Sequence, residues 1–302
     1  MNETEQFLPK GRAFFSILYE DGDIVAVNKA SGISVGGERW EDQVPRLDRI
    51  LAKALSGAGE TPGPEEARGG ARLYTVHRID KDTSGLVVFA KNAGAHRTLS
   101  GAFESRRVEK IYTAVVHGRP PWPGGTILCK FPLLPNGNKR HLTIIDKYRG
   151  KPSVTGFRLL LSAGNYSVIE AQPSTGRTHQ IRVHLAALGH PVVCDSLYGK
   201  NTGNKRGVYL SSFKRKWRGD AFEEKPLLRR LGLHAHRLTL PGYASTDGGH
   251  MDGGGNNDGR HTGNDGARMN RDNTGGDLYL EAPLPRDMAA LIRQMKKTAG
   301  ML

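Results

Sequence analysis

The spacing of apolar and polar residues divides most of the chain into short strands and helices. Residues 17–19 and 24–27 are apolar and rich in β-branched side chains, so they predict two strands joined by a turn at EDGD, residues 20–23. Apolar residues at helical spacing predict a helix within residues 44–55. The same two patterns predict further strands at residues 73–76, 86–90, 110–118, 165–172, 233–240 and 278–284 and further helices at residues 94–107, 177–189 and 287–295.

Residues 245–277 interrupt the last pair of strands with a different composition. Gly, Asn and Asp dominate this segment and apolar residues are nearly absent, so it cannot bury enough surface to offset the entropy of ordering it. It also lacks the fixed period of calcium-binding aspartate-glycine repeats. We therefore expect a disordered insertion here, and a flexible loop at residues 56–71, which are rich in Gly, Pro and Glu.

The charge of the chain points to a polyanionic partner. The 302 residues carry a formal net charge of +14, and the section 200–230 is strongly basic, notably at Lys214, Arg215, Lys216 and Arg218. Such an excess of Lys and Arg favours nucleic acid as partner, with an acidic membrane surface as the second candidate. A basic protein without such a partner stays open on charge alone.

Several classes of protein are excluded or disfavoured by what the sequence lacks. The two cysteines, Cys129 and Cys194, lie far apart, which argues against a disulfide framework or a cysteine-ligated zinc site and favours a reducing cytosol. The first residues have no signal-peptide core, and no apolar run reaches the roughly 18 residues of a membrane span. Glycine-rich phosphate loops of the P-loop or Rossmann type are absent, so a nucleotide cofactor is not expected. We expect a cytoplasmic protein.

The densest cluster of polar residues is HRIDKDTSG, residues 77–85, between two predicted strands. Asp80 and Asp82 are candidate nucleophiles or general bases on this loop, although an isolated Asp-x-Asp more often caps turns. Arg78 supplies the positive charge that keeps a partly buried carboxylate ionised. Thr83 and Ser84 can bond the turning backbone, and Gly85 can adopt a conformation that other residues avoid.

A second polar cluster lies in and around the predicted helix 177–189. It comprises Arg177, His179, Arg182, His184 and His190. A zinc site is disfavoured because His179 and His184 are five residues apart rather than four and no glutamate lies between them. We expect hydrogen bonding in the core or on the helix surface for at least His184. Tyr112, on a predicted strand, fits either a core position or stacking on a flat ring such as a nucleobase.

Three segments together resemble the signature motifs of the RluA-type RNA pseudouridine synthases. They are HRIDKDTSGLVVFAKN, KIYTAVVHG and PSTGRTHQIRVHLAALGHPVVCDSLYG, in the family's order. The resemblance covers roughly residues 17–242 and 278–297. It implies an α+β fold, with a mixed, largely antiparallel sheet in two halves and with helices and loops around a basic catalytic cleft. It also implies a single catalytic domain over residues 17–302, after a tail at 1–16 too short for an RNA-binding module of the S4 type.

The resemblance also assigns roles to individual residues. Asp80 corresponds to the catalytic aspartate, Tyr112 to the tyrosine that stacks on the target base and is implicated in proton removal, and Arg182 to the arginine that pairs with the aspartate. Arg78 matches the arginine that fills the space left by the flipped base. The remaining candidates for substrate binding are His77, Thr83, Arg177, His179 and Gln180. The chain departs from the family pattern at Ile79, at Ala30-Ser31-Gly32 and at Cys194, positions that affect packing and loop rigidity.

The implied function is the isomerisation of uridine to pseudouridine in structured RNA, without a cofactor or metal, by a monomer. Ribosomal RNA is favoured over transfer RNA as substrate. A non-catalytic RNA-binding or RNA-remodelling relative is the alternative, and the intact set of Asp80, Tyr112 and Arg182 speaks against it. A glycosidase-like hydrolase would need a second carboxylate within reach of Asp80, and the sequence offers no obvious one.

Overall fold

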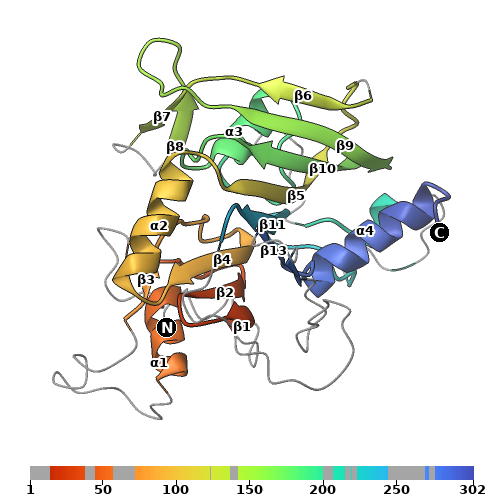
Figure 1. Ribbon diagram of the computed structural model, residues 1–302. Coiled ribbons are helices and arrows are strands. Elements are labelled where there is room, and N and C mark those ends of the chain that lie inside the picture. Colours follow the sequence, from red (N-terminus) through yellow and green to blue (C-terminus); the bar gives the residue numbers. More distant parts are fainter. Residues whose placement is uncertain are drawn as a thin grey trace. The chain divides into compact units, whose positions relative to one another are not determined.

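The structure, a computed structural model, describes two compact units (Figure 1). Unit 1 comprises Met1–Glu109 and Arg237–Pro283, and unit 2 comprises Lys110–His236 and Leu284–Leu302. The described residues are 14–37, 45–56, 72–122, 124–136, 142–199, 207–214, 219, 223–243, 269–271 and 276–302. Each unit contains antiparallel strands and helices, as expected for an α+β fold.

Unit 1 is built around two fully or largely buried strands. β2 (Ile24–Lys29) pairs with β1 (Phe15–Glu20) on one side and with β4 (Ser84–Ala90) on the other, and the short β3 (Tyr74–Thr75) also pairs with β4. α2 (Ala93–Glu104) packs on β4, and the side chain of Asn92 caps its start by accepting a hydrogen bond from the N–H of Ala95. α1 (Leu47–Leu55) buries Leu47 and Leu51. The predicted turn, strands and helices of this region are confirmed.

The last strands of unit 1 form a ladder at the predicted insertion. β11 (Leu233–Leu240) begins in unit 2 and continues into unit 1, where it pairs with β13 (Leu278–Glu281). β12 (Met269–Arg271) pairs with β13 as well. The structure therefore differs from the expected disorder at these three residues, because β13 supplies backbone partners for them. The other residues of the insertion lie outside the described residues except for Gly276 and Asp277, and so do residues 57–71.

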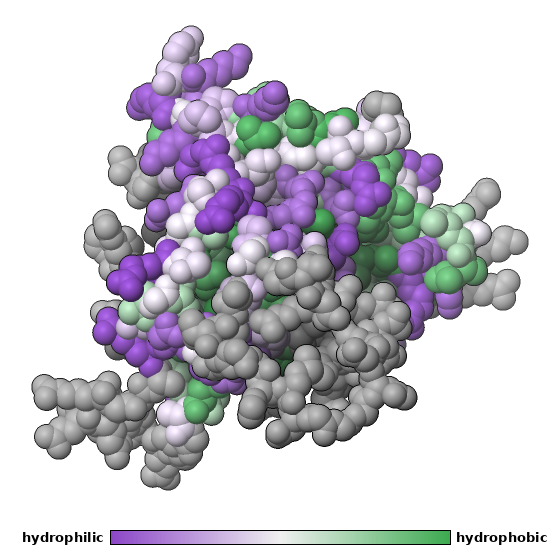
Figure 2. Space-filling model, in the orientation of Figure 1, coloured by the Kyte–Doolittle hydropathy of each residue, from purple (hydrophilic) through white to green (hydrophobic). Residues whose placement is uncertain are grey.

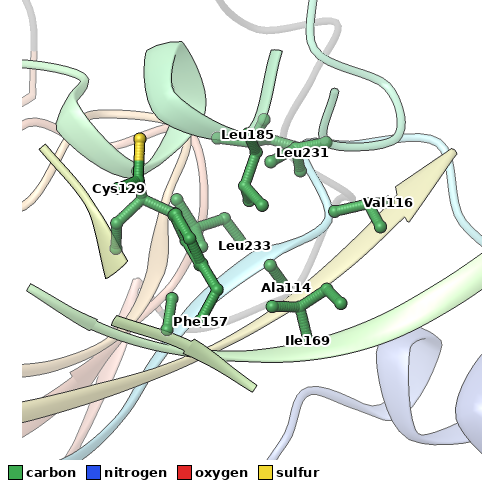
Figure 3. Close-up of a cluster of buried hydrophobic side chains, with 11 residues drawn as sticks. Ala114, Val116, Cys129, Phe157, Ile169, Leu185, Leu231 and Leu233 are labelled. Atoms are coloured by element: carbon green, nitrogen blue, oxygen red, sulfur yellow. The ribbon is translucent and has the colours of Figure 1, made fainter. Parts of the chain in front are cut away.

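Unit 2 is a sheet covered on both faces by helices. Its strands run in the order β5 (Glu109–His117), β10 (Tyr166–Pro173), β9 (Thr155–Ala163) and β6 (Thr126–Cys129). Alternate residues of a strand point to opposite faces. Ala114, Val116 and Ile169 accordingly join one buried cluster with Leu185 of α3 (Gln180–Ala187), as Figure 3 shows. Val115 and Val168 join another with Met288, Leu291 and Met295 of α4 (Arg286–Thr298).

The segment after β6, residues 130–151, contains a hairpin that the sequence patterns do not predict. β7 (Leu133–Asn136) pairs with β8 (Leu142–Ile145). A 3₁₀ turn, η3 (Leu210–Ser212), follows later in the chain. Among the described residues, no helix combines the length and the apolar character needed to cross a membrane.

Candidate active site

The HRIDKDTSG segment forms a turn that leads directly into β4. The N–H of Thr83 donates to the carbonyl of Asp80 over 3.1 Å, which closes the turn and leaves the Asp80 side chain half-buried and Asp82 exposed. The strand begins at Ser84, two residues earlier than predicted, so Ser84 and Gly85 belong to β4 rather than to the turn. Gly85 has a φ of 112°, which a residue with a Cβ rarely adopts.

A buried ammonium group braces this turn from the end of β2. Lys29 is 1% exposed, and its Nζ donates to the carbonyl oxygens of Ala30, Ile33 and Lys81 at 2.8, 2.9 and 2.9 Å. A lysine ammonium has three donors, so these three carbonyls match its full capacity and offset the cost of burying the charge. The last of them belongs to the residue after Asp80.

Two further hydrogen bonds join the same segments. The N–H of Gly32 donates to the carbonyl of Lys81 at 2.8 Å, and the hydroxyl of Ser31 donates to the carbonyl of Asp82 at 2.6 Å. The residues after β2 therefore hold two consecutive carbonyls of the Asp80 turn. Lys29 was not among the residues predicted from the sequence to support this loop. The available signal was a lysine two residues after the predicted strand 24–27.

The other predicted residues of the loop have different environments. The N–H of Val88 donates to Nε2 of His77 at 3.0 Å, and the His77 ring stacks on Phe103 at a centroid distance of 4.6 Å. This imidazole therefore fastens the loop to β4. Thr83 is 1% exposed, and its hydroxyl has no hydrogen-bond partner among the described residues. Arg78 is exposed. RNA contacts by these side chains stay predictions.

Unit 2 contains a buried ion pair between Arg182 of α3 and Asp195. Nε of Arg182 donates to Oδ2 of Asp195 at 2.8 Å and Nη2 donates to Oδ1 at 2.9 Å, with side-chain exposures of 3% and 0%. Burial alone would raise the pKa of Asp195, but the hydrogen bonds and charge of Arg182 and the N–H groups of Leu197 and Tyr198 lower it. Asp195 therefore stays ionised and fixes the plane of the guanidinium group. Asp195 lies in the CDSLYG end of the third motif and was given no role in the sequence-based predictions.

Tyr198 links this ion pair to His179. The Arg182 Cζ lies 5.2 Å from the centroid of the Tyr198 ring. The Tyr198 hydroxyl accepts from the N–H of Thr143 and shares a hydrogen bond with Nδ1 of His179, each at 2.8 Å. Burial raises the pKa of Tyr198, so the hydroxyl keeps its proton. His179, with a φ of 54°, occupies the left-handed region immediately before α3.

Gln180 is almost fully engaged within the protein. It is 4% exposed, and its Nε2 donates to the carbonyl of Val154 and to the hydroxyl of Thr155, both at 2.9 Å. Its Oε1 accepts from the hydroxyl of Thr175 at 2.7 Å and from the N–H of Arg177 at 3.0 Å. These contacts make Gln180 a positioning residue for the PSTGR loop. A direct contact with RNA, as the sequence predicted, stays a prediction for Gln180 and for the half-buried Arg177.

His184 is hydrogen-bonded, as expected, and of the two expected positions it has the one in the core. Its Nε2 lies 2.9 Å from the carbonyl oxygen of Phe131, which can only accept, so Nε2 carries the proton. Nδ1 then accepts from the Thr155 hydroxyl at 3.0 Å, and burial lowers the pKa of the imidazole. The part of the chain that the structure describes contains no group of three His, Cys, Asp or Glu residues suited to a metal ion.

The candidate residues fall into two sets, one in each unit. The loop of unit 1 carries His77, Arg78, Asp80 and Thr83, whereas unit 2 carries Tyr112, Arg177, His179, Gln180 and Arg182. Tyr112 lies half-buried on β5, opposite Ala171 of β10, and packs against the hydrophobic cluster beneath α3. The expected pairing of Asp80 with Arg182 would join the two units, as would the expected basic cleft. Both stay predictions.

A family comparison bears on these segments. Residues 23–187, more than half of the chain, match the family model described as RNA pseudouridylate synthase. The chain belongs to this family. The matched residues include both the Asp80 loop and the helix that carries Arg182. The resemblance of the sequence motifs to RluA-type RNA pseudouridine synthases is thereby confirmed.

Curated relatives of this pseudouridylate synthase family member have bacterial sources. The chain is 36% identical over 197 residues to the ribosomal large subunit pseudouridine synthase D of Borreliella burgdorferi, covering 65% of this chain and 58% of the relative. It is 33% identical over 241 residues to the dual-specificity RNA pseudouridine synthase RluA of Vibrio vulnificus, covering 78% and 81%. The chain thus spans little more than half the length of the first of these relatives.

Solved structures similar to this family member support the fold. Human RNA Pseudouridylate Synthase Domain Containing 4 has a TM-score of 0.57 and 23% identity, covering 93% of this chain and 92% of its own. Human RNA Pseudouridylate Synthase Domain Containing 1 has a TM-score of 0.54 and 24% identity, covering 95% and 98%. The expected α+β fold is confirmed.

Proposed function

We propose that this chain converts specific uridines of structured RNA to pseudouridine, with Asp80 as the nucleophile. The observation that carries the proposal is the family match over residues 23–187, which contains Asp80, Tyr112 and Arg182. The braced turn around Asp80 supports it, because a nucleophile must be held in a fixed geometry against its target. The net charge of +14 fits a phosphate-rich substrate.

In the proposed reaction the Asp80 carboxylate attacks the target uridine, either at the anomeric carbon of the sugar or at the pyrimidine ring. The bond between the base nitrogen and the sugar breaks, the base rotates, and a ring carbon forms the new bond to the sugar. The bond between Asp80 and the uridine breaks during or after this step, which releases the product and restores the carboxylate. The ring carbon loses a proton, and the released nitrogen gains one, so the reaction is an isomerisation that needs no cofactor. Tyr112 is assigned to stacking on the base and to the proton removal.

Access to the target requires that the uridine leave the base stack. Arg78 is exposed at the edge of the Asp80 turn and is assigned to fill the space that the flipped base leaves. Arg182 is assigned to the charge balance of Asp80. This role is supported by the fixed orientation of the Arg182 guanidinium group, because two of its nitrogens donate hydrogen bonds to Asp195.

Ribosomal RNA is the proposed substrate, because curated relatives bear names of ribosomal large subunit pseudouridine synthases. Transfer RNA is the second candidate. We further propose that the protein acts as a monomer in the cytoplasm. A non-catalytic RNA-binding or RNA-remodelling relative is the alternative function, and it is distinguished by the absence of pseudouridine formation.

The test of this function is pseudouridine mapping across all RNAs of cells with and without the gene. The proposal predicts that one or a few sites in large-subunit ribosomal RNA lose their modification when the gene is deleted and regain it on complementation. If sites disappear only in transfer RNA, the substrate is corrected. If none disappears, the proposed activity is refuted.

A further inference from the structure

The turn that follows β8, residues 146–151, presents an unusually exposed aromatic ring. Tyr148 is 97% exposed, whereas aromatic side chains are generally buried to a large extent. Lys147, Arg149 and Lys151, which surround it in sequence, are exposed as well. Figure 2 shows hydrophilic residues gathered at the upper left, where Figure 1 places β7 and β8.

Asp146 makes the backbone of this 146–151 turn rigid. Its Oδ1 accepts from the N–H groups of Tyr148 and Arg149 at 2.9 and 2.8 Å, and its Oδ2 accepts from Nε of Arg149 at 3.0 Å. The two backbone hydrogen bonds are the main reason that the pKa of Asp146 is lowered, so the carboxylate stays ionised in its bracing position.

The end of the 146–151 turn is closely packed on β7. The N–H of Gly150 donates to the carbonyl of Asp146 at 2.9 Å, and Leu133 and Lys151 exchange hydrogen bonds of 3.0 and 2.8 Å. A Cβ on Gly150 would lie 2.9 Å from the carbonyl oxygen of Pro132 and too close to that of Asp146. The position therefore requires glycine, and the turn holds Tyr148 outward on a fixed support.

We propose that the 146–151 turn is an RNA contact outside the residues assigned to catalysis, at which Tyr148 stacks on an unpaired base of the substrate. The proposal rests on the proposed function for the identity of the partner. A ring on a rigid turn loses little conformational freedom on binding, and every base offers a flat face for stacking. Lys147 and Lys151 lie on the same turn and supply charges for the phosphates on either side of such a base.

The charges favour RNA over a protein or a membrane surface as the occupant. The turn contains three cationic residues, Lys147, Arg149 and Lys151, and one carboxylate, that of Asp146, which is bound to Arg149. The described residues form no ion pair with Lys147 or Lys151. One exposed ring among such lysines is typical of surfaces that bind single-stranded nucleic acid, where stacking adds to phosphate contacts. A peptide or lipid partner would require a wider apolar surface around the ring.

The test compares Tyr148→Ala, Tyr148→Phe and the double variant Lys147→Gln/Lys151→Gln in direct binding to a transcript of large-subunit ribosomal RNA over a range of salt concentrations. Tyr148→Ala should weaken binding about tenfold at every salt concentration, and Tyr148→Phe by less than about twofold, because stacking depends on the ring. The double variant should reduce the slope of log affinity against log salt concentration by the equivalent of about one to two phosphate contacts. The value of kcat at saturating RNA should stay that of the parent.

Tyr279→Ala is the matched control, since Tyr279 is a 42% exposed tyrosine on β13 whose hydroxyl lies 3.5 Å from a carboxylate oxygen of Asp277, and it should leave binding unchanged. Parent-like binding by Tyr148→Ala would overturn the proposal. Equal losses in Tyr148→Ala and Tyr148→Phe would overturn stacking in favour of the hydroxyl. Because binding is measured directly, a parent protein that binds RNA but forms no pseudouridine would refute the proposed function and leave this contact supported.

Discussion

Replacing Asp195 with asparagine should destabilise the protein strongly, because it removes a buried negative charge that is bonded twice to the buried Arg182. Loss of one member of a buried ion pair typically costs about 3–5 kcal/mol. The asparagine carbonyl can still accept from the N–H groups of Leu197 and Tyr198, but its NH₂ group then faces a guanidinium nitrogen, and both are donors. We therefore expect a loss of about 2–4 kcal/mol in the free energy of unfolding.

Urea unfolding followed by circular dichroism measures this loss. The matched control is Glu170→Gln, which breaks the ion pair with the half-exposed Arg158 and should cost less than about 1 kcal/mol. The pKa of Asp195 is lower in the folded protein than in the unfolded chain, so its contribution is present above the unfolded pKa and is lost as the pH falls through the folded pKa. The difference between parent and variant should be full at neutral pH and shrink below about pH 4. A loss no larger than that of Glu170→Gln would refute the reasoning.

Three other perturbations test separate parts of the structure. Lys29→Met removes the ammonium donor from the carbonyls of Ala30 and Ile33, while that of Lys81 keeps the N–H of Gly32. The free energy of unfolding should therefore fall by about 2–4 kcal/mol and kcat should fall more than RNA affinity; parent-like kcat would contradict the bracing of the Asp80 turn. Deleting residues 245–275 removes β12, but β13 keeps its pairing with β11, and the N–H of Gly242 still donates to Asp277 at 3.1 Å. The melting temperature and turnover should therefore stay nearly unchanged, and a selective loss of RNA binding would identify a recognition arm. Neutralising the basic section at Lys214, Arg215, Lys216 and Arg218 should weaken RNA binding. The slope of log affinity against log salt concentration should fall by the equivalent of up to about four phosphate contacts, and an unchanged slope would show that these residues are only a solvated surface.

Local patterns predicted most of the elements, and the reasons for the omissions are physical. The strands β1, β2, β5, β10 and β11 follow from apolar residues between clear turn signals. The hairpin of β7 and β8 was missed because its section is basic and turn-rich, so the pairing of the two strands decides its conformation. β6 (TILC) and β9 (TGFRLLLSA) are largely apolar but were left unassigned in the sequence-based prediction. β12 is the same case, since only the backbone of β13 makes a strand of that segment.

The sequence was enough to predict which segments carry the candidate site, but not which contacts their side chains make. Motifs identified the Asp80 loop and the helix of Arg182, yet Lys29 meets Lys81 across 52 positions of sequence and Arg182 meets Asp195 across 13. Such partners depend on the tertiary fold. The sequence motifs also could not separate side chains that contact a substrate from side chains that hold other residues in position. In its described contacts, Gln180 holds other residues in position.

The most direct test of the central claim is pseudouridine formation by purified Asp80→Asn and Asp82→Asn proteins on large-subunit ribosomal RNA, with product counted by mass spectrometry. Asp80→Asn keeps the size of the side chain but removes the nucleophilic charge, so turnover should fall below detection while RNA binding stays within a few-fold of the parent. Asp82 is exposed in the same turn, and its amide variant should keep most of the parent's turnover. Turnover by Asp80→Asn together with an inactive Asp82→Asn would contradict the assignment of the nucleophile.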